Sequence, residues 1–376
     1  MLEQHEMTST LGPKPRLDHE VVVIGGGQAG LAIGYHLARE GSDFVILEAA
    51  NEPAAAWKTR WDSLKLFTPV RYSGLPGLRF PGDPDSYPGR DEVASYLTEY
   101  ARHFALPVEL GSRVCAIRRS DGCYLVELEH RAYNAAQVVV ATGPFQVPFV
   151  PTVADGLAHE VVQFHSTAYR TPHDVPAGPV LVVGGGNTGF QIAEELSATH
   201  EVHLSIGSRQ TPLPQRILGR DLFWYLEKTA AMRKSTDTRI GRRLAGRDTL
   251  IGSNPRTLRK RYGVRLRPRA VGASGHTIRF SDDSALDVAS VIWATGFRND
   301  HSWIKAPIFD DRHRVVHGRG VTGSPGLYFL GLTWQYTRGS ALLGWVGDDA
   351  AYIANQINTF RTHRSRLQTG EPVGTR

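Results

Sequence analysis

Apolar and polar positions along the chain follow two alternating patterns. Runs rich in Val, Ile and Leu, such as residues 20–24 and 43–48, are typical of buried strands. Between them, LAIGYHLARE (31–40) spaces its apolar residues three and four apart and stops before Gly41, as an amphipathic helix does. Strand, helix and strand in this order predict an α/β fold with a parallel sheet.

The first turn, GGGQAG (25–30), joins the first strand to this helix. It matches the GxGxxG pattern, in which missing side chains let a pyrophosphate reach backbone N–H groups at a helix N-terminus. Glu48, about twenty residues on, ends the next strand, where a carboxylate accepts hydrogen bonds from a ribose diol. We therefore predict a dinucleotide site built from Gly25, Gly27, Gln28, Ala29, Gly30 and Glu48.

The same order recurs at GPVLVVGGGNTGFQIAEEL (178–196), followed by the strand VHLSI. Where Glu48 follows the first turn, the corresponding position here is Gly207, followed by Ser208 and Arg209. A guanidinium and a hydroxyl can bind a ribose 2′-phosphate that a carboxylate would repel, so this site favours NADPH over NADH. A solvated surface arginine is the alternative for Arg209. The predicted residues are Gly184, Gly186, Asn187, Thr188, Gly189, Ser208 and Arg209.

Two Ala-Thr-Gly turns, at 141–143 and 294–296, each end a β-rich run that follows one glycine turn. Each fits a strand that returns the chain towards the other domain, with glycine allowing close approach to a cofactor. Thr142, Gly143, Thr295 and Gly296 are therefore candidate cofactor-binding residues, and two ordinary tight turns are the alternative.

The order of these parts predicts two Rossmann-like, three-layer α/β domains, one inserted in the other. We expect the discontinuous first domain at 18–160 and 296–365 and the second at 170–295, with a disordered leader at 1–17 and a disordered tail at 366–376. The glycine-led helical run from Gly339 to Ile357 either closes the first domain or turns its N-terminus towards the cofactor.

The formal net charge of +6 arises in one segment. Arg209 to Arg269 holds 17 Lys and Arg against 4 Asp and Glu, leaving 26 against 33 elsewhere. Its helical part, at about 218–262, is expected either to cover the active-site cleft or to be a solvated excursion. It lacks a helix-turn-helix, zinc or aromatic-platform pattern, so we expect no nucleic-acid partner.

No membrane span is predicted, because every apolar run is far shorter than the roughly 20 residues required. The polar N-terminus lacks a signal peptide, which indicates a cytoplasmic protein. Only two cysteines are present, Cys115 and Cys123, and they are expected to pack in a strand hairpin. The absence of a CxxC pair excludes a dithiol reductase.

With these motifs in their order, the chain resembles the flavin-containing monooxygenases from about Glu20 to Ile357. It is most similar to small bacterial members and to plant auxin-forming monooxygenases. The segments that carry the resemblance are GGGQAG with Glu48, WKTRWDSLKLFTP, YPGRDEV, HSTAY, GGGNTG, GSRQTPLP and WATGF.

The resemblance implies FAD in the first site, NADPH in the second, and O2 with a small-molecule sulfide, amine or ketone as substrates. Oxygen would be transferred from a flavin C4a-(hydro)peroxide, and a homodimer is left open. No catalytic residue is assigned, but Asn187 is a candidate for holding NADP⁺, or else a residue tolerated at an αL turn. His165 either contributes a proton or is a linker histidine satisfied by backbone groups.

Two departures from the family pattern stand out. The fingerprint FxGxxxHxxx(Y/F/W) reads HEVVQFHSTAY, with His159 and Val161 in place of Phe and Gly. Ala54–Ala56 stand where a Gly-Gly pair is usual, so we expect a turn without positive φ there, or a shifted approach to the flavin. Trp57 is expected to contact the flavin, although its spacing with Trp61 also fits one packed helical face.

Two other functions remain open at this point. One is a reductase or oxidase that passes electrons from NADPH through FAD to a quinone or protein. The other is a non-catalytic flavin redox sensor, against which the intact second turn and Arg209 argue.

Overall fold

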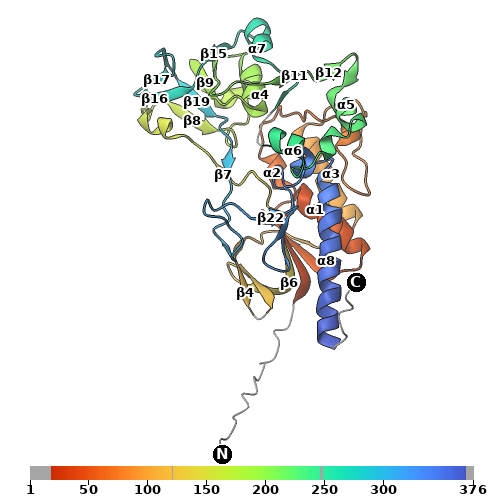
Figure 1. Ribbon diagram of the computed structural model, residues 1–376. Helices are drawn as coiled ribbons and strands as arrows, with labels where there is room; N and C mark the ends of the chain where they lie inside the picture. The colour runs from red at the N-terminus through yellow and green to blue at the C-terminus, as the bar shows by residue number, and fades with distance from the viewer. Residues whose placement is uncertain (1–17, 121, 246–248, 370–376) are drawn as a thin grey trace, which may run out of the picture.

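The computed structural model describes residues 18–120, 122–245 and 249–369 (Figure 1). The leader predicted at 1–17 and residues 370–376 of the predicted tail lie outside these residues. Residues 366–369, which we expected in the tail, continue the last helix instead.

The larger sheet is built around three parallel strands in which both faces are buried. β1 (His19–Ile24) pairs in parallel with β2 (Phe44–Leu47) on one side and β6 (Ala132–Val140) on the other. Alternate residues of β1 point to two different cores, Val21 and Val23 to one, Val22 and Ile24 to the other. This explains the unbroken apolar runs in the sequence. The remaining strands are β3 (Val108–Glu109), β4 (Val114–Ser120), β5 (Cys123–Leu128), β21 (Ile304–Lys305), β22 (His317–Gly318), β23 (Val321–Thr322) and β24 (Leu327–Phe329).

Three helices cover one face of this sheet: α1 (Gln28–Arg39), α3 (Arg90–His103) and α8 (Val346–Thr369). Their apolar side chains form one core with β1 and β2, and α8 packs along α1 (Figure 1). The antiparallel hairpin β4–β5 pairs with the first residues of β6 and packs its apolar side chains on the other face of β1 and β2. It carries both cysteines as predicted, with Cys123 buried, but Cys115 is exposed. Because α8 packs along α1 in this core, the C-terminal run closes the first domain.

The smaller sheet has five parallel strands in the order β15-β10-β9-β19-β8. Helices α4 (Asn187–Leu196) and α7 (Pro255–Arg261) pack on one face, and an antiparallel three-stranded sheet packs on the other. The predicted pair of three-layer α/β domains is confirmed, with β-structure as the third layer of the second domain. The strands are β8 (Val162–His165), β9 (Pro179–Val183), β10 (Glu201–Ser205), β15 (Arg265–Arg267), β19 (Ser290–Trp293), β16 (Ala270–Ser274), β17 (Thr277–Phe280) and β18 (Ala285–Asp287).

The second sheet begins before residue 170. β8 pairs with β19, and Ala154 and Val161 pack into the core of this sheet. We therefore propose that the inserted domain spans about 151–295. Two short antiparallel strands, β7 (Val147–Pro148) and β20 (Phe297–Arg298), carry the chain out of the first domain and back (Figure 1).

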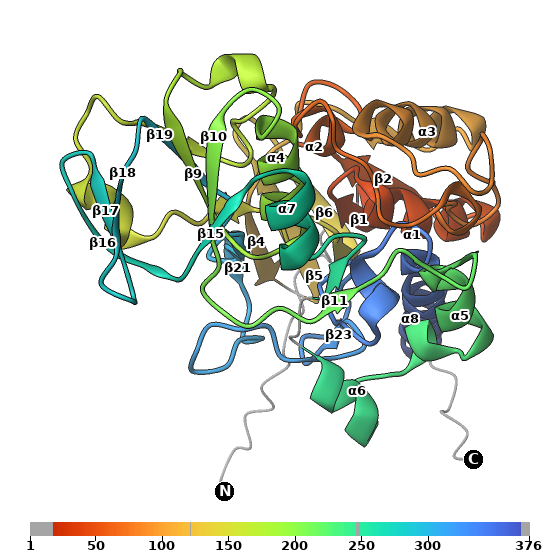
Figure 2. The same ribbon diagram turned by 90° about the horizontal axis from the view of Figure 1, so that it is seen from above.

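The basic segment forms a strap, which we define as residues 211–245 and 249–253. It leaves the second sheet after β10 and lies against the first domain beside α8 (Figure 2). Phe223 and Met232 of the strap are buried against Trp345, with Phe67 and Tyr72 alongside. The strap is therefore not a fully solvated excursion. Its elements are β11 (Pro212–Leu213), β12 (Arg216–Ile217), β13 (Arg220–Asp221), α5 (Leu222–Lys228), α6 (Arg239–Leu244) and β14 (Leu250–Ile251).

Candidate functional site

The first glycine turn needs glycine at two positions for steric reasons. A Cβ on Gly25, where φ is +109°, would lie 2.7 Å from the carbonyl oxygen of Ala141, and one on Gly30 would lie 1.9 Å from that of Gly25. Over Gly27, the N-cap of α1, no atom lies within 4 Å of the Cβ position. The turn is thus pressed against the Ala-Thr-Gly turn on one side and open on the side where backbone N–H groups face out. This arrangement fits a pyrophosphate at the helix N-terminus.

Glu48 lies next to Gly26 at the entrance of this turn, which we call its mouth. Its two carboxylate oxygens accept hydrogen bonds from the backbone N–H groups of Gly26, at 2.8 Å, and Ala50, at 2.9 Å. A cavity of about 120 Å³ lies beside it. The carboxylate, held by these hydrogen bonds, keeps lone pairs that can accept hydrogen bonds from a ribose diol. The apolar side chains that line the cavity suit an adenine ring. The cavity is lined by Gly26, Leu31, Glu48, Pro53, Ala54, Leu97, Ala101, Val108 and Leu110.

The second glycine turn repeats these contacts. A Cβ on Gly184 would lie 2.1 Å from the carbonyl oxygen of Ala294, and one on Gly189 would lie 2.1 Å from that of Gly184. Gly186, the N-cap of α4, is open like Gly27. The residues of this turn therefore fit a second dinucleotide.

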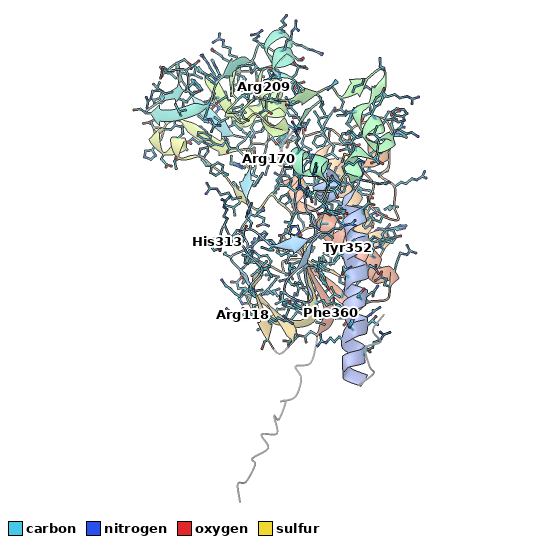
Figure 3. All side chains as sticks on the ribbon, in the orientation of Figure 1. Arg118, Arg170, Arg209, His313, Tyr352 and Phe360 are labelled. Carbon is cyan, nitrogen blue, oxygen red and sulfur yellow. The ribbon has the colours of Figure 1, made fainter. Side chains whose placement is uncertain are left out.

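The mouth of the second turn carries cations where the first carries Glu48. Arg269 donates a hydrogen bond to the carbonyl oxygen of Gly207 at 2.7 Å, next to Ser208 and Arg209. Both arginines are exposed, and neither pairs with a carboxylate among the described residues. Figure 3 shows Arg209 in the second domain. Two unpaired guanidinium groups and a hydroxyl suit a 2′-phosphate.

Sequence reasoning missed Arg269, because 60 residues separate it from Arg209 in a segment full of arginines. β15 pairs in parallel with β10, so the residues that follow the two strands lie at the same edge of the sheet. An expected strand pairing was the signal that could have identified it.

The hydroxyls of both Ala-Thr-Gly turns are tied into the linker between the domains. Thr142 Oγ1 accepts a hydrogen bond from Gln146 at 3.0 Å, and Thr295 Oγ1 donates to the carbonyl oxygen of Phe149. Gly143 and Gly296 both have positive φ, at +69° and +84°. The two turns therefore share a position against a glycine turn and a role in redirecting the chain.

His165 is satisfied by groups of the linker. Its Nε2 lies 3.0 Å from the carbonyl oxygen of Gly296, and its Nδ1 lies 3.0 Å from Thr167 Oγ1 and accepts from the backbone N–H of Thr167. Burial, aided by the charge of Arg60 and opposed by the Gly296 contact, lowers the pKa of the imidazole. These contacts favour a neutral linker histidine with the proton on Nε2 over a proton donor.

Trp57 lies beside the first turn. Its indole N–H donates to Gln28 Oε1 at 3.1 Å, and Gln28 Nε2 donates to the carbonyl oxygen of Ala341 at 3.1 Å. Helix α2 (Ala55–Lys58) ends before Trp61, which is buried in the core of the second domain. The two tryptophans therefore do not share one helical face.

Ala54 corrects the expected turn before Trp57. Its φ is +55°, in the left-handed region, although a side chain is present. Ala54 thus adopts a conformation that glycine adopts without strain, at a cost of about 1 kcal/mol.

Asn187 fixes the strap to the second turn. Its Nδ2 donates to the carbonyl oxygen of Thr249 at 3.2 Å, and its Oδ1 accepts from the backbone N–H of Ile251 at 2.9 Å. Of the other predicted residues, Ala29 packs against Gly331, and Thr188 lies in the first turn of α4.

Asp221 fixes the other end of the strap to the first domain. It accepts hydrogen bonds from the Tyr87 hydroxyl at 2.6 Å, from Gln215 at 2.8 Å and from the backbone N–H of Phe223 at 2.8 Å. Burial and this carboxylate raise the pKa of Tyr87 to about 12, so the phenol stays a donor. Nothing in the sequence pattern identified this contact.

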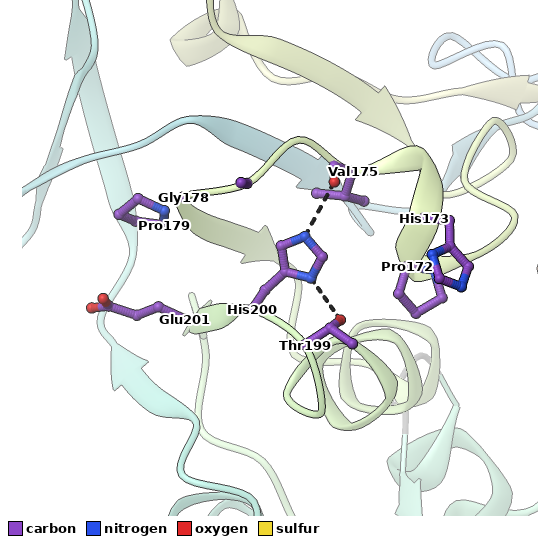
Figure 4. A pocket seen from close by; sticks show the side chains of 9 residues that line it. Pro172, His173, Val175, Gly178, Pro179, Thr199, His200 and Glu201 are labelled. Carbon is purple, nitrogen blue, oxygen red and sulfur yellow. Dashed lines mark hydrogen bonds between the residues drawn. The ribbon is translucent and has the colours of Figure 1, made fainter.

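A cavity of about 420 Å³ lies away from both glycine turns (Figure 4). It is found where β9 and β10 begin, whereas the turns follow the strands' carboxyl ends. Its His200 already contacts Thr199 Oγ1 and the carbonyl oxygen of Val175, at 2.8 and 3.1 Å. This cavity carries no sign of the cofactor sites.

The comparisons with known proteins agree with this geometry. Residues 22–216 match the family model described as pyridine nucleotide-disulphide oxidoreductase. The chain belongs to this family. The CzcO-like uncharacterized oxidoreductase of Geobacillus kaustophilus is 43% identical over 340 residues, covering 90% of this chain and 98% of that protein.

Flavin monooxygenases are also among the similar proteins. The flavin-containing monooxygenase from Stenotrophomonas maltophilia has a TM-score of 0.77 at 29% identity, over 91% of this chain and 98% of that one. The probable indole-3-pyruvate monooxygenase YUCCA1 of Arabidopsis thaliana is 26% identical over 379 residues, covering 91% of this chain and 90% of that protein. The predicted membership of the flavin-containing monooxygenases is confirmed, and with it an oxidoreductase whose family cofactors are FAD and NADP(H).

Two negative findings concern only the part of the chain that the structure describes. No helix there is long and apolar enough to cross a membrane. No group of three or more metal-ligating side chains is found there either.

Proposed function

We propose that the chain is an NADPH- and O2-dependent flavoprotein monooxygenase that oxygenates a small-molecule sulfide, amine or ketone. The observation that carries the proposal is the pair of matched glycine turns, one with a carboxylate at its mouth and one with two unpaired guanidinium groups. This difference supports FAD at the first turn and NADPH at the second.

In the first domain, the N-terminus of α1 would hold the FAD pyrophosphate over Gly27, and Glu48 would accept the ribose hydroxyls. Trp57 and Gln28 hold each other beside this turn and so shape the wall next to the cofactor. When bound, FAD and NADPH supply the electron transfer and the activation of oxygen. The protein supplies binding, orientation and exclusion of water.

In the second domain, the N-terminus of α4 would hold the NADPH pyrophosphate over Gly186, with Ser208, Arg209 and Arg269 on the 2′-phosphate. His165 stays neutral and positions Gly296 by its hydrogen bond. We assign it a positioning role rather than a catalytic one.

The strap would keep water from the space between the domains. It is tied to the second turn by Asn187 and to the first domain by Asp221 and Phe223, so it connects the second turn to the first domain. Excluding water matters for an oxygenase, because an unprotected oxygenating species decays to hydrogen peroxide.

The experiment is a coupling measurement on FAD-loaded protein with panels of sulfides, amines and ketones. NADPH consumption, oxygenated product and hydrogen peroxide are measured together, with NADH as the control reductant. We expect product to equal most of the NADPH consumed for at least one substrate class, and NADH to be the poorer reductant. NADPH consumption with hydrogen peroxide alone, unchanged by any substrate, would instead support an oxidase or a reductase with another acceptor. Whether the chain is a homodimer stays a prediction.

A further inference from the structure

The outer side of the strap carries an apolar side chain that nothing in the described residues covers. Leu218 is 93% exposed at the tip of the β12–β13 hairpin, and its neighbour Ile217 is 36% exposed. Leu218 has a φ of +47° and Gly219 one of +76°, a two-residue turn that Asn-Gly would form with less strain. Single exposed leucines are common, but this one is also in a strained conformation and makes no packing contact in return.

Cations and aromatic rings surround this tip. Arg216 and Arg220 flank it on the two strands and are exposed. The guanidinium of Arg220 and the ammonium of Lys228 lie 5.4 and 5.9 Å from the ring centre of Trp224. None of the three cations pairs with a carboxylate among the described residues. We call Arg216–Arg220, Trp224, Tyr225 and Lys228 the basic tip.

The acidic residues next to the tip have their carboxylates engaged with the first domain. Asp221 is buried and accepts from Tyr87, and Glu227 accepts from the indole N–H of Trp345. Neither carboxylate forms an ion pair with Arg216, Arg220 or Lys228, so these three exposed cations remain available to an anionic partner. Further exposed cations of the strap are Lys234, Arg239, Arg242 and Arg243, whereas Arg233 pairs with Asp348.

The basic tip stands on a rigid base. Phe223 stacks on Phe67, with ring centres 5.9 Å apart, and packs against Trp345 at 5.6 Å. The Tyr225 hydroxyl donates to the carbonyl oxygen of Ile217 at 3.0 Å, which ties α5 to the hairpin. Leu218 is thus presented outward by a fixed support; β12 and α5 lie at the outer edge of the molecule in Figure 1.

We propose that the basic tip docks this protein on an anionic lipid surface. Leu218 and Ile217 enter the boundary of the acyl chains, Trp224 and Tyr225 lie at the headgroups, and Arg216, Arg220 and Lys228 bind anionic headgroups. A nucleic acid would use the cations but would leave Leu218 in water, whereas an anionic bilayer accommodates both features. The proposal does not depend on the proposed function, because no cofactor residue takes part in it.

The test measures co-sedimentation of full-length, FAD-loaded protein with lipid vesicles. Vesicles of phosphatidylcholine alone are compared with vesicles of phosphatidylcholine and phosphatidylglycerol at low and high salt. We expect binding to the anionic vesicles only, weakening as salt rises. Flavin absorbance and the melting temperature show that each variant is folded.

Two variants separate the apolar from the electrostatic part. Leu218→Asn relieves the turn and is expected to weaken vesicle binding about tenfold. Arg216→Ser with Arg220→Ser is expected to weaken it by a factor of about ten or more. Val316→Ser is the matched control, since Val316 is 56% exposed outside the strap, and it should bind like the parent protein.

Three outcomes would overturn the proposal. One is the absence of binding to anionic vesicles by the parent protein. Another is equal binding by the parent and Leu218→Asn. The third is self-association of the parent protein that Leu218→Asn abolishes, together with no binding of the parent protein to vesicles. This result would identify the basic tip as a contact with a second copy of this chain.

Discussion

The two glycine turns have the same backbone and opposite electrostatics. Both press one glycine against an Ala-Thr-Gly turn, a second against the first, and leave a third open at a helix N-terminus. They differ at the mouth, where backbone N–H groups hold Glu48 in the first turn and Arg269 lies over Gly207 in the second. In the proposed function, the shared backbone of the turns accommodates a dinucleotide at each, and the side chains at the mouth distinguish FAD from NADPH.

The largest effects are expected from glycines that touch backbone. Gly30→Ala and Gly189→Ala would each place a methyl group about 2 Å from a carbonyl oxygen, so the turn must rebuild. We expect Gly30→Ala to abolish FAD retention, and Gly189→Ala to keep FAD but lose reduction by NADPH. Flavin content and anaerobic reduction are the measurements.

Gly27→Ala and Gly186→Ala are the matched controls, because their Cβ positions are open and their φ values are negative. Both should fold, with a stability change of about 1 kcal/mol or less, and bind their dinucleotide more weakly. If Gly189→Ala lost FAD as readily as Gly30→Ala, the assignment of one cofactor to each turn would be wrong.

The next effect concerns the choice of nicotinamide cofactor. Arg209→Ala and Arg269→Ala each remove a charge-assisted contact worth about 1.5–3 kcal/mol, so we expect the KM for NADPH to rise about 10- to 100-fold. The KM for NADH, which lacks the 2′-phosphate, should change little. Arg265→Ala is the control, because Arg265 lies in β15 and pairs with Glu201. An equal rise for both cofactors would contradict a 2′-phosphate role.

A smaller effect concerns the linker between the turns. Burial lowers the pKa of His165, so the unfolded chain takes up a proton on this residue at a higher pH than the folded protein. His165 therefore opposes folding as pH falls below about 6.5, the ordinary histidine pKa, and its effect is absent above it. We expect His165→Gln to lose less melting temperature between pH 7 and pH 5.5 than the parent protein.

One result would contradict the pH dependence expected for His165→Gln. Four other histidines, His36, His203, His301 and His317, have pKa values lowered mainly by burial, so some acid sensitivity must remain in the variant. Identical pH profiles for His165→Gln and the parent would show that the His165 imidazole is not shielded as described.

The smallest effect is expected at Ala54. Ala54→Gly relieves a positive φ and should raise the free energy of unfolding by about 0.5–1 kcal/mol. Ala56→Gly, inside α2, should lower it by about 0.5–1 kcal/mol. Chemical denaturation of the two FAD-loaded variants measures both changes, and a loss of stability in Ala54→Gly would count against a strained turn.

The sequence predicted local features well and distant contacts poorly. Strand, turn and helix around residues 25 and 184 follow from apolar periodicity and glycine spacing, which are local properties. Arg269 and the bond between Tyr87 and Asp221 depend on which strands become neighbours and on how the strap folds back, and one sequence does not encode either in its spacing. Ala54 was mispredicted because the backbone conformation is set by the surrounding packing rather than by the residue's own preference.

Two separate dinucleotide sites are tested most directly by calorimetric titration of FAD-saturated protein with NADP⁺, followed by measurement of the flavin that remains bound. We expect one NADP⁺ per chain, bound without displacing FAD, with affinity reduced in Arg209→Ala and unchanged in Arg265→Ala. Displacement of FAD by NADP⁺, or no NADP⁺ binding to the FAD-loaded protein, would contradict the assignment of two separate dinucleotide sites.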